Sequence, residues 1–586
     1  MNKNLGISKA KLFSPFVEWS VDYPSFSGNP FDVDATVTFT HSQTGETRET
    51  GMFYDGDGVW KFRFAGVDDG NWTFTTSSAV DALNGFAGEV DVDPDPDARG
   101  FVVAEGDKWA RQVGDGELEA FLPSYVMADF FLYEYIDDPN KIDIFIQDVM
   151  LDGGFTGIHL PVFGQWLNAR LYDANDNASK DVGDYTSPDP RTFEILETII
   201  TKVHNAGGVV HIWEWADGNS GELADGTRVA LGRVDKLIGG ENGEVHQTIL
   251  EYIADRLGPL PGWTMGYGFD LAEWTNPEDM LTRSDFFRDQ TDFDHMIGGR
   301  DGETINSFNK NPGGRIDDDN AEWAVGQDYA GYQHHIPNYG HYLDAIQAKF
   351  EGEELDIPAF LEDRFRVRGN NNGKDFDYQE VVNLQWYGAI AGGVANIIGD
   401  ISGINRDREA LLGNESHPFP EEIETILQTY NTFFNENQRF HLDSSEKNEL
   451  TGGVDNKQYA LYSDSQKDLS IYAEATEIVT LNLSALAGDA AFANGAQVIA
   501  VNTHAAYAEI DLGILDMTDQ QIDLGVSSDW ALSIGPAGGA TGGTNTAPEA
   551  VDDGMFGQPV FAIGNQGKTG PPHCRAIKSL LIPAAR

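Results

Sequence analysis

The sequence predicts a multidomain protein in which a central (β/α)8 TIM barrel is flanked by N-terminal and C-terminal antiparallel β-sandwich domains. The 586-residue chain is too long for one hydrophobic core, because single cores rarely exceed about 300 residues. Its middle alternates short apolar runs with helical periodicity, whereas both flanks alternate apolar and polar residues as strands do. We place the domains at 13–103, 104–438 and 439–538, followed over 539–586 by a linker and a disordered or non-native tail.

The segment 13–103 has the two-residue periodicity of β-strands. Its runs include FDVDATVTFTH, GMFYDGDGVWKFRFAG and NWTFTTSS, which are separated by Gly, Asp and Asn. Such runs between closely spaced turn residues predict an antiparallel β-sandwich. FSPFVEW, NPFDVDATVTFTH, FYDGDGVWKFRF and GNWTFTTSS also resemble a small β-sandwich domain of unknown function that precedes the barrel in many bacterial glycoside hydrolases.

The barrel is predicted from eight apolar runs with helical stretches such as RTFEILETIITKVHNAGG between them. Strand and helix in alternation, over about 300 residues, are typical of a (β/α)8 barrel. A helix over EEIETILQTYNTFFNEN is expected to close it near residue 437. The runs cover 121–130, 155–163, 208–217, 263–274, 295–302, 323–335, 357–365 and 394–400.

The C-terminal part returns to strand-like alternation in YALYSDS, LSIYAEA, IVTLNL, QVIAVNT and WALSIGP. These runs predict a second antiparallel β-domain that ends near Pro536. A Gly/Thr-rich linker follows. The last 32 residues then hold four basic and no acidic side chains, together with the single cysteine, Cys574. This composition differs so much from the rest of the chain that we expect a non-native tail.

The charge excludes several kinds of partner. With 95 acidic and 38 basic residues, the formal net charge is -57. Nucleic acids and anionic membranes are polyanions, so we expect neither as a partner, and we interpret the charge as adaptation to salty water. One cysteine permits no intramolecular disulfide bond. No apolar run of about 18 residues is present, so we expect no membrane span. We expect a secreted or periplasmic protein, and because no signal-peptide pattern is present, we expect that its signal has been removed.

The candidate catalytic groups are the carboxylates at the ends of barrel strands, where TIM barrels place their reactive groups. The seventh run, IPAFLEDRFRVRG, carries Glu362 at its end, and Arg364, Arg366 and Arg368 share its face while the strand stays extended. Arginine beside a carboxylate lowers its pKa and keeps it ionised, which suits a nucleophile. The alternative is a structural ion pair.

The fourth run, WTMGYGFDLAEW, carries Asp270 and Glu273. They are three residues apart, so both face one pocket only if the strand ends between them. Burial against Phe269 and Trp274 would raise a carboxyl pKa, as an acid catalyst requires. In the alternative interpretation Asp270 caps the next helix and Glu273 is solvated.

The order of elements resembles the large clan of retaining glycoside hydrolases on (β/α)8 barrels. IPAFLED is similar to the clan's nucleophile strand, and QWYGAIAGGVANIIGD resembles the seventh helix and eighth strand of apiosidase-like and collagenase-like predicted hydrolases. The resemblance implies a nucleophile at Glu362 and an acid after strand four. The clan shows Asn-Glu there, whereas this chain has Phe269-Asp270 and Ala272-Glu273, so the identity of the acid and retention of configuration both stay open.

Other strand ends carry residues that suit sugar binding. Aromatic faces stack on pyranose rings, and His and Arg bind their hydroxyl groups. Taken singly, each of these residues is expected in the core, and only their recurrence at strand ends favours sugar binding. The candidates are His159, Trp166, His211, Trp213, Trp215, His295, Arg300, Tyr332, His334, Arg364 and Arg366.

A metal site is predicted only weakly. Asp173, Asn175, Asn177 and Asp184 match positions 1, 3, 5 and 12 of a calcium loop, but Ala178 replaces the turn glycine, and a solvated loop is the alternative. The histidines lack zinc spacings, so we expect no catalytic metal and no cofactor besides a structural calcium ion.

The expected substrate is a polysaccharide or oligosaccharide. Arginines are scarce in this chain, and paired hydrogen bonds from arginine suit carboxylate or sulfate groups. Together with the charge, the arginines beside Glu362 favour a marine anionic algal glycan, either an agar, porphyran or carrageenan type of galactan or a uronate polymer. The alternatives are a polysaccharide lyase and a catalytically inactive carbohydrate-binding barrel.

Overall fold

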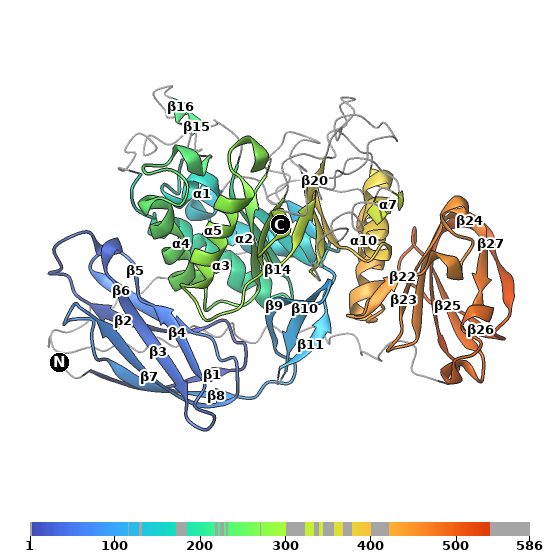
Figure 1. Ribbon diagram of the computed structural model, residues 1–586, viewed down its shortest axis with the longest axis horizontal. Coiled ribbons are helices and arrows are strands. Elements are labelled where there is room, and N and C mark those ends of the chain that lie inside the picture. The colour runs from blue at the N-terminus through green and yellow to red at the C-terminus, as the bar shows by residue number, and fades with distance from the viewer. Residues whose placement is uncertain are drawn as a thin grey trace, which may run out of the picture.

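The computed structural model shows a parallel barrel with a β domain on either side (Figure 1), which confirms the predicted fold class. It describes residues 3–114, 116–127, 132–171, 185–216, 221–222, 228–229, 232–269, 271–300, 323–332, 339–340, 342–343, 357–366, 378–399 and 421–538. The segment 539–586 lies outside these ranges, so the expected tail stays a prediction. In the described part of the chain, no helix has the length and apolar character needed to cross a membrane.

The N-terminal domain consists of two sheets with a shared aromatic core. One has the strand order β1 (Asn4–Lys11), β8 (Ala87–Asp93), β7 (Gly70–Ser78), β3 (Ala35–His41) and β4 (Thr47–Gly51), and the other has β2 (Val17–Asp22), β6 (Val59–Phe64) and β5 (Phe53–Tyr54). Trp19 of β2 stacks on Phe62 at 5.1 Å between ring centroids and packs on Phe74 of the opposite sheet at 4.7 Å. The domain begins at Asn4, because β1 pairs in parallel with β8.

The barrel closes through pairing of its first strand with its last, and each strand falls on one of the eight predicted runs. Adjacent strands are parallel, as the apolar character of the runs predicts for strands that are buried on both faces. The strands are β12 (Tyr125–Met127), β13 (Gly157–Pro161), β14 (Val209–Trp215), β17 (Trp263–Gly268), β18 (Ile297–Arg300), β19 (Ala330–Tyr332), β20 (Ala359–Arg366) and β21 (Val394–Gly399).

Helices surround the barrel. The longest, α3, shows why they form where they do: Asp189 caps its N-terminus by accepting from the Arg191 backbone N–H, and Pro190 occupies the first turn. Phe193 and Ile200 on its buried face pack on the barrel. The described helices are α1 (Leu132–Asp137), α2 (Asn140–Ile144), α3 (Pro190–Asn205), α4 (Glu244–Leu257), α5 (Pro277–Arg288), α7 (Tyr378–Ile390) and α10 (Glu421–Asn431), and π-helical turns follow α2 and α10.

A small antiparallel sheet closes the amino-terminal end of the barrel. It consists of β9 (Arg99–Glu105), β10 (Lys108–Val113) and β11 (Glu117–Ala120). Trp109 packs against Tyr125, Tyr329 and Phe360, which lie at or just before the starts of β12, β19 and β20. The opposite end, where the strands finish, is therefore the place for a site.

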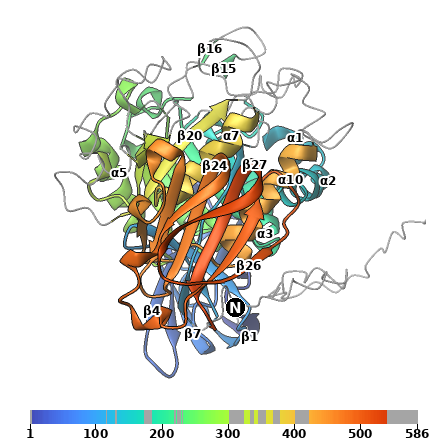
Figure 2. The same ribbon diagram turned by 90° about the vertical axis from the view of Figure 1, so that its right-hand side faces the viewer.

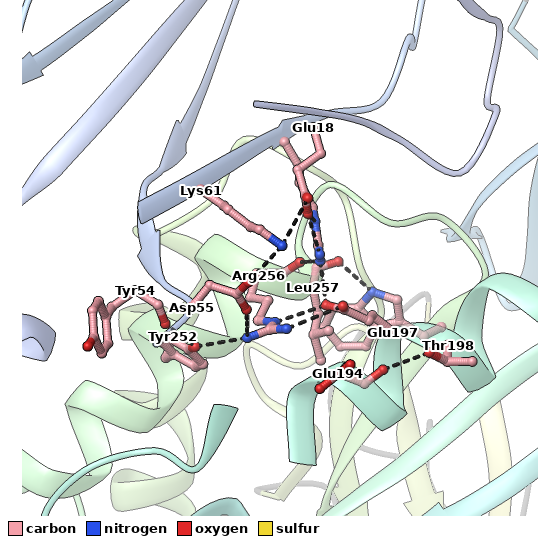
Figure 3. Close-up of polar contacts among 12 residues, drawn as sticks. Glu18, Tyr54, Asp55, Lys61, Glu194, Glu197, Thr198, Tyr252, Arg256 and Leu257 are labelled. Atoms are coloured by element: carbon pink, nitrogen blue, oxygen red, sulfur yellow. Dashed lines mark hydrogen bonds and ion pairs between the residues drawn. The ribbon is translucent and has the colours of Figure 1, made fainter. Parts of the chain in front are cut away.

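Buried ion pairs dock the N-terminal domain on α3 and α4 (Figure 3). Arg63 of β6 contacts Glu18 at 2.7 Å and Glu197 of α3 at 2.8 Å. Arg256 of α4 contacts the same Glu197 at 2.9 Å and Asp55 at 2.9 Å. Burial alone would raise the pKa of Glu197, but the two guanidinium groups hold it at about 2. The carboxylate is therefore ionised, and both domains contribute its partners.

The C-terminal domain is one six-stranded sheet that packs on α7 and α10 (Figure 2). Its order is β22 (Ser444–Glu446), β23 (Gln458–Ser463), β24 (Asp468–Asn482), β27 (Asp519–Pro536), β25 (Ala496–Asn502) and β26 (Ile510–Leu515). Tyr472 of β24 stacks on Trp386 of α7 with ring centroids 5.1 Å apart. The barrel and this sheet thus share one hydrophobic core.

A short hairpin, β15 (Gly221–Glu222) with β16 (Arg228–Val229), follows β14.

Candidate active site

Strand alternation decides which side chains enter the barrel. On β14, His211 and Trp213 belong to the interior, whereas Ile212 packs with the surrounding helices. Glu214 also faces outward, where it pairs with Arg283 of α5 at 2.5 Å. The predicted pair His211 and Trp213 therefore shares the interior with groups from the opposite strands.

Glu362 is the carboxylate at the centre of this interior. Its side chain is fully buried, and its Oε1 accepts hydrogen bonds from Nε2 of His211 at 3.1 Å and Nε1 of Trp213 at 2.9 Å. Its Oε2 is also buried. Oε1 is thus held by two donors, whereas Oε2 forms no hydrogen bond in the described part of the chain, and the Tyr329 hydroxyl is a further donor beside the carboxylate.

Two inward-facing glycines make room for this carboxylate. A Cβ atom added to Gly266 of β17 would lie 1.7 Å from Oε1 of Glu362, and one added to Gly331 of β19 would lie 2.7 Å from Oε2. Both distances are far below van der Waals contact. Sequence reasoning missed these residues, although glycine at an inward position of a barrel strand is itself a signal of close approach.

Tyr329 and Thr264 complete the surroundings of Glu362. Oγ1 of Thr264 lies 2.9 Å from Nδ1 of His211, so the hydroxyl can donate to Nδ1 while Nε2 keeps the proton that it donates to Glu362. Burial, followed by the charge of Glu362, holds the pKa of Tyr329 well above its usual range. The phenol is therefore neutral beside the carboxylate.

His159 and Arg300 extend the cluster to the carboxyl ends of the strands. His159 packs edge-on against Trp213 with ring centroids 4.2 Å apart. Arg300 ends β18 and is only 2% exposed, with its guanidinium carbon 5.8 Å from the Trp213 ring centroid and 5.9 Å from that of Phe269. The structure thus brings together five of the predicted residues, namely His159, His211, Trp213, Arg300 and Glu362.

The chain turns sharply after β17. Such a turn is the condition under which Asp270 and Glu273 could face one pocket. A 3-10 turn, Leu271–Glu273, follows the strand, and the side chain of Glu273 is exposed. Trp274 is buried, and its indole N–H donates to the Phe269 carbonyl at 3.1 Å. Glu273 therefore lacks the burial expected for an acid catalyst. Asp270 lies outside the described residues.

Three predicted binding residues lie outside the interior cluster. The Trp166 indole donates to the Glu214 carbonyl at 3.0 Å and packs on Phe193 of α3. The Trp215 indole donates to Oε1 of Glu214 at 2.8 Å, and His295 stacks on Trp263, whose strand begins there, at 3.9 Å. These contacts are those of core residues, which was the alternative for each.

For several predicted residues, the structure does not describe the position of the side chain. The backbones of Tyr332, Arg364 and Arg366 lie in β19 and β20, but their side chains, like His334, Arg368 and the calcium candidates, fall outside the described part. Those calcium candidates are Asp173, Asn175, Asn177 and Asp184. Within the described ranges, no group of three or more His, Cys, Asp or Glu side chains is placed to hold a metal ion.

Comparison with known proteins supports the fold. Residues 15–79 match the family model named Domain of unknown function (DUF5060), and no curated protein matches the chain. The structure is similar to that of a candidate glycoside hydrolase from Bacteroides vulgatus ATCC 8482, with a TM-score of 0.64 and 14% identity over 90% of this chain and 99% of that one. The likeness shows that the two chains share a fold over most of their length.

Weaker likenesses are found to two further solved structures. A glycoside hydrolase family 5 protein from the same strain matches with a TM-score of 0.49 and 12% identity over 75% of this chain and 94% of its own. A GH30 endoxylanase from Clostridium papyrosolvens C71 matches with a TM-score of 0.41 and 12% identity over 71% and 97%.

Proposed function

We propose that the protein is a glycoside hydrolase that cleaves a polysaccharide or oligosaccharide, with Glu362 as its nucleophile. One observation carries the proposal: Glu362 enters the barrel from the seventh strand with Oε1 held by His211 and Trp213, while Oε2 forms no hydrogen bond in the described part of the chain. Two donors on one oxygen fix the orientation of the carboxylate, while the second oxygen keeps the lone pair that attacks an anomeric carbon.

The acid catalyst in this proposal lies on the turn after β17. Protonation of the leaving oxygen requires a second carboxyl group about 5 to 5.5 Å from the nucleophile for retention, or about 6.5 to 9.5 Å for inversion. Asp270 and Glu273 are the two candidates. Phe269 supports this location, because its ring packs on Trp213 at 5.1 Å and so brings the start of the turn to the donor of Glu362.

The substrate that we propose is an anionic algal glycan, either a sulfated galactan or a uronate polymer. Arg300 supports it, because its buried guanidinium lies beside Trp213 at the carboxyl end of the barrel. Arginine binds sulfate or carboxylate through paired hydrogen bonds. Arg364 and Arg366 lie on the strand of the nucleophile and add to this argument by sequence position.

The test measures reducing ends released from agarose, porphyran, κ-carrageenan, alginate and a neutral mannan. We expect release from at least one anionic polymer, and the Glu362→Gln variant should lose at least about a thousandfold in rate. Glu278→Gln serves as the control, because Glu278 is exposed on α5. The anomeric configuration of the first product decides between retention and inversion.

Four outcomes contradict parts of the proposal. Activity that survives Glu362→Gln removes the nucleophile. Products that absorb in the ultraviolet indicate a lyase, and binding without turnover indicates a carbohydrate-binding barrel. Equal rates on the neutral mannan and on the anionic polymers remove the proposed substrate class.

A further inference from the structure

The turn that carries both candidate acids is held by its own backbone. The N–H groups of Trp274 and Thr275 both donate to the Leu271 carbonyl at 2.9 Å. The Trp274 indole donates to the Phe269 carbonyl at 3.1 Å, so its ring covers the start of the turn. These bonds define the shape of the turn, but they do not attach it to the rest of the barrel.

A carboxyl group from another part of the chain attaches both ends of the turn, while within the turn Arg233 donates to the Glu273 carbonyl, at 3.5 Å. Glu241, which precedes α4, is half-buried, and its Oε1 accepts hydrogen bonds from the Tyr267 hydroxyl at 2.5 Å and from Oγ1 of Thr275 at 2.5 Å. Tyr267 lies on β17 two residues before the turn of residues 269–275, and Thr275 is the last residue of that turn. One oxygen of Glu241 therefore joins both ends of the turn.

Glu241 does not lie in the barrel interior. Gly266 faces Glu362 inside the barrel, so its neighbour Tyr267 faces the helices, where its ring packs on Trp274 at 5.2 Å and on His246 of α4 at 6.2 Å. The partner of the Tyr267 hydroxyl is thus separated from the nucleophile by the strand itself. Glu241 acts on the chemistry only through the turn.

We propose that Glu241 is a positioning residue that fixes the turn of residues 269–275, and with it the acid catalyst, against the barrel. The role in catalysis rests on the proposed function, whereas the role in holding the turn does not. Residues 271–273 are presented from a short 3-10 turn, so a small rotation of that turn would move a carboxyl group out of reach of the leaving oxygen.

The charges around Glu241 support a role near neutral pH. Burial, with smaller contributions from Asp279 and Asp235, raises the pKa of Glu241 to about 7, although the bonds from Thr275 and Tyr267 oppose the shift. The nearby cations pair with other carboxylates: Arg283 pairs with Glu214 while lying over the Tyr267 ring, and Arg233 and Lys236 pair with Asp235. Arg233 also donates to the Glu273 carbonyl of the turn at 3.5 Å. His246, on α4, accepts from the Asn242 backbone N–H through Nδ1 and donates to Glu214 through Nε2. A glutamine at position 241 would mimic the protonated form and keep an oxygen that accepts both bonds.

The experiment compares three variants of the intact chain. Glu241→Ala removes the acceptor, Glu241→Gln keeps it without the charge, and Glu278→Gln is the control on an exposed carboxylate of α5. The measurements are amide hydrogen exchange at Trp274 and Thr275, and kcat and KM on whichever polymer of the panel the wild type cleaves fastest.

We expect Glu241→Ala to raise exchange at these two amides by about tenfold while the centre of α4 stays protected. It should lower kcat by about 10- to 100-fold with KM changed by less than about threefold, because a displaced acid affects the transition state more than binding. Glu241→Gln should keep amide exchange and kcat near those of the wild type. Its kcat should no longer change with pH near 7, because the titrating carboxyl group is gone.

Unchanged exchange at Trp274 and Thr275 in Glu241→Ala would overturn the proposal, and so would a uniform rise through α4 and α5. If Glu241→Ala does not fold, Thr275→Val removes one of the two bonds and must raise exchange at the same amides. A wild type that cleaves no polymer overturns the proposed function, and the exchange data still decide whether Glu241 holds the turn.

Discussion

Gly266 lies so close to Glu362 that a Cβ atom added to it would stand 1.7 Å from the carboxylate oxygen Oε1. Strand four and strand seven therefore meet inside the barrel at a position where only a hydrogen atom fits. A larger side chain at position 266 would therefore displace the carboxylate of Glu362. The predictions below start from this contact.

Replacing Gly266 by alanine should displace Glu362 from its donors His211 and Trp213. Overpacking of a buried site typically costs about 1 to 3 kcal/mol, so the free energy of unfolding should fall by that amount and hydrolysis should be lost. Denaturant unfolding and reducing-end assays measure both. Gly488→Ala is the control, since nothing lies within 4 Å of the Cβ it would gain, and a Gly266→Ala variant as active as the control contradicts the geometry.

Trp213→Phe should remove one hydrogen bond to Glu362 and keep most of the ring in the interior cluster. A hydrogen bond to a charged group contributes about 1.5 to 3 kcal/mol, so kcat should fall by about 10- to 100-fold. Trp72→Phe, which loses a bond to the Asp68 carbonyl in the N-terminal domain, should leave kcat unchanged. A raised KM at constant kcat would instead assign Trp213 to substrate binding.

Arg63→Met should weaken the docking of the N-terminal domain on α3, because it removes the ion pair between Arg63 and Glu197. It removes the partner that Glu18 and Glu197 share, while Lys61 still pairs with Glu18 and Arg256 still pairs with Glu197. A hydrogen bond to a charged group contributes about 1.5 to 3 kcal/mol, so the free energy of unfolding should fall by about that amount. Lys9→Met is the control, because the Lys9–Asp91 pair is exposed. Adding Glu18→Gln and Glu197→Gln to Arg63→Met should restore part of the loss, and the absence of any restoration would point to packing.

Glu197 should make stability depend on pH in acid. Its pKa is lowered to about 2 in the folded protein, against about 4.3 in an unfolded chain, so the unfolded state binds the proton first. The contribution is therefore complete above about pH 4.3 and disappears as pH falls toward about 2. Urea unfolding between pH 2 and pH 6 measures the free energy of unfolding at each pH. This free energy should change less with pH in Glu197→Gln than in the wild type, and an equal pH dependence in both would contradict the assignment.

Much of the architecture follows from local patterns. Apolar runs long enough for one strand, with helical periodicity between them, predicted every strand of the barrel because burial on both faces demands such runs. The start of the N-terminal domain was less predictable. β1 lies in NLGISKAK, whose polar character says little about a sheet edge, and its place depends on pairing with β8.

The candidate site was predictable where alternation alone decides the direction of a side chain. His211 and Trp213 on β14 and Glu362 on β20 lie well inside their strands, so period two brings them to the interior. Trp215 ends its strand and Trp166 and His295 lie outside theirs, and there the local turn decides the direction. Their indole and imidazole groups found partners in the core.

The sequence by itself determined the order of domains, the eight strands and the identity of the seventh-strand carboxylate, because these depend on periodicity and on position along a strand. Only the tertiary structure decided what surrounds that carboxylate. Its donor Trp213 is 149 residues away in the chain, and the glycines that admit it come from two other strands. The link from Glu241 to Thr275 likewise joins segments 34 residues apart, which no local pattern encodes, since burial and hydrogen bonding between distant segments arise only when the barrel closes.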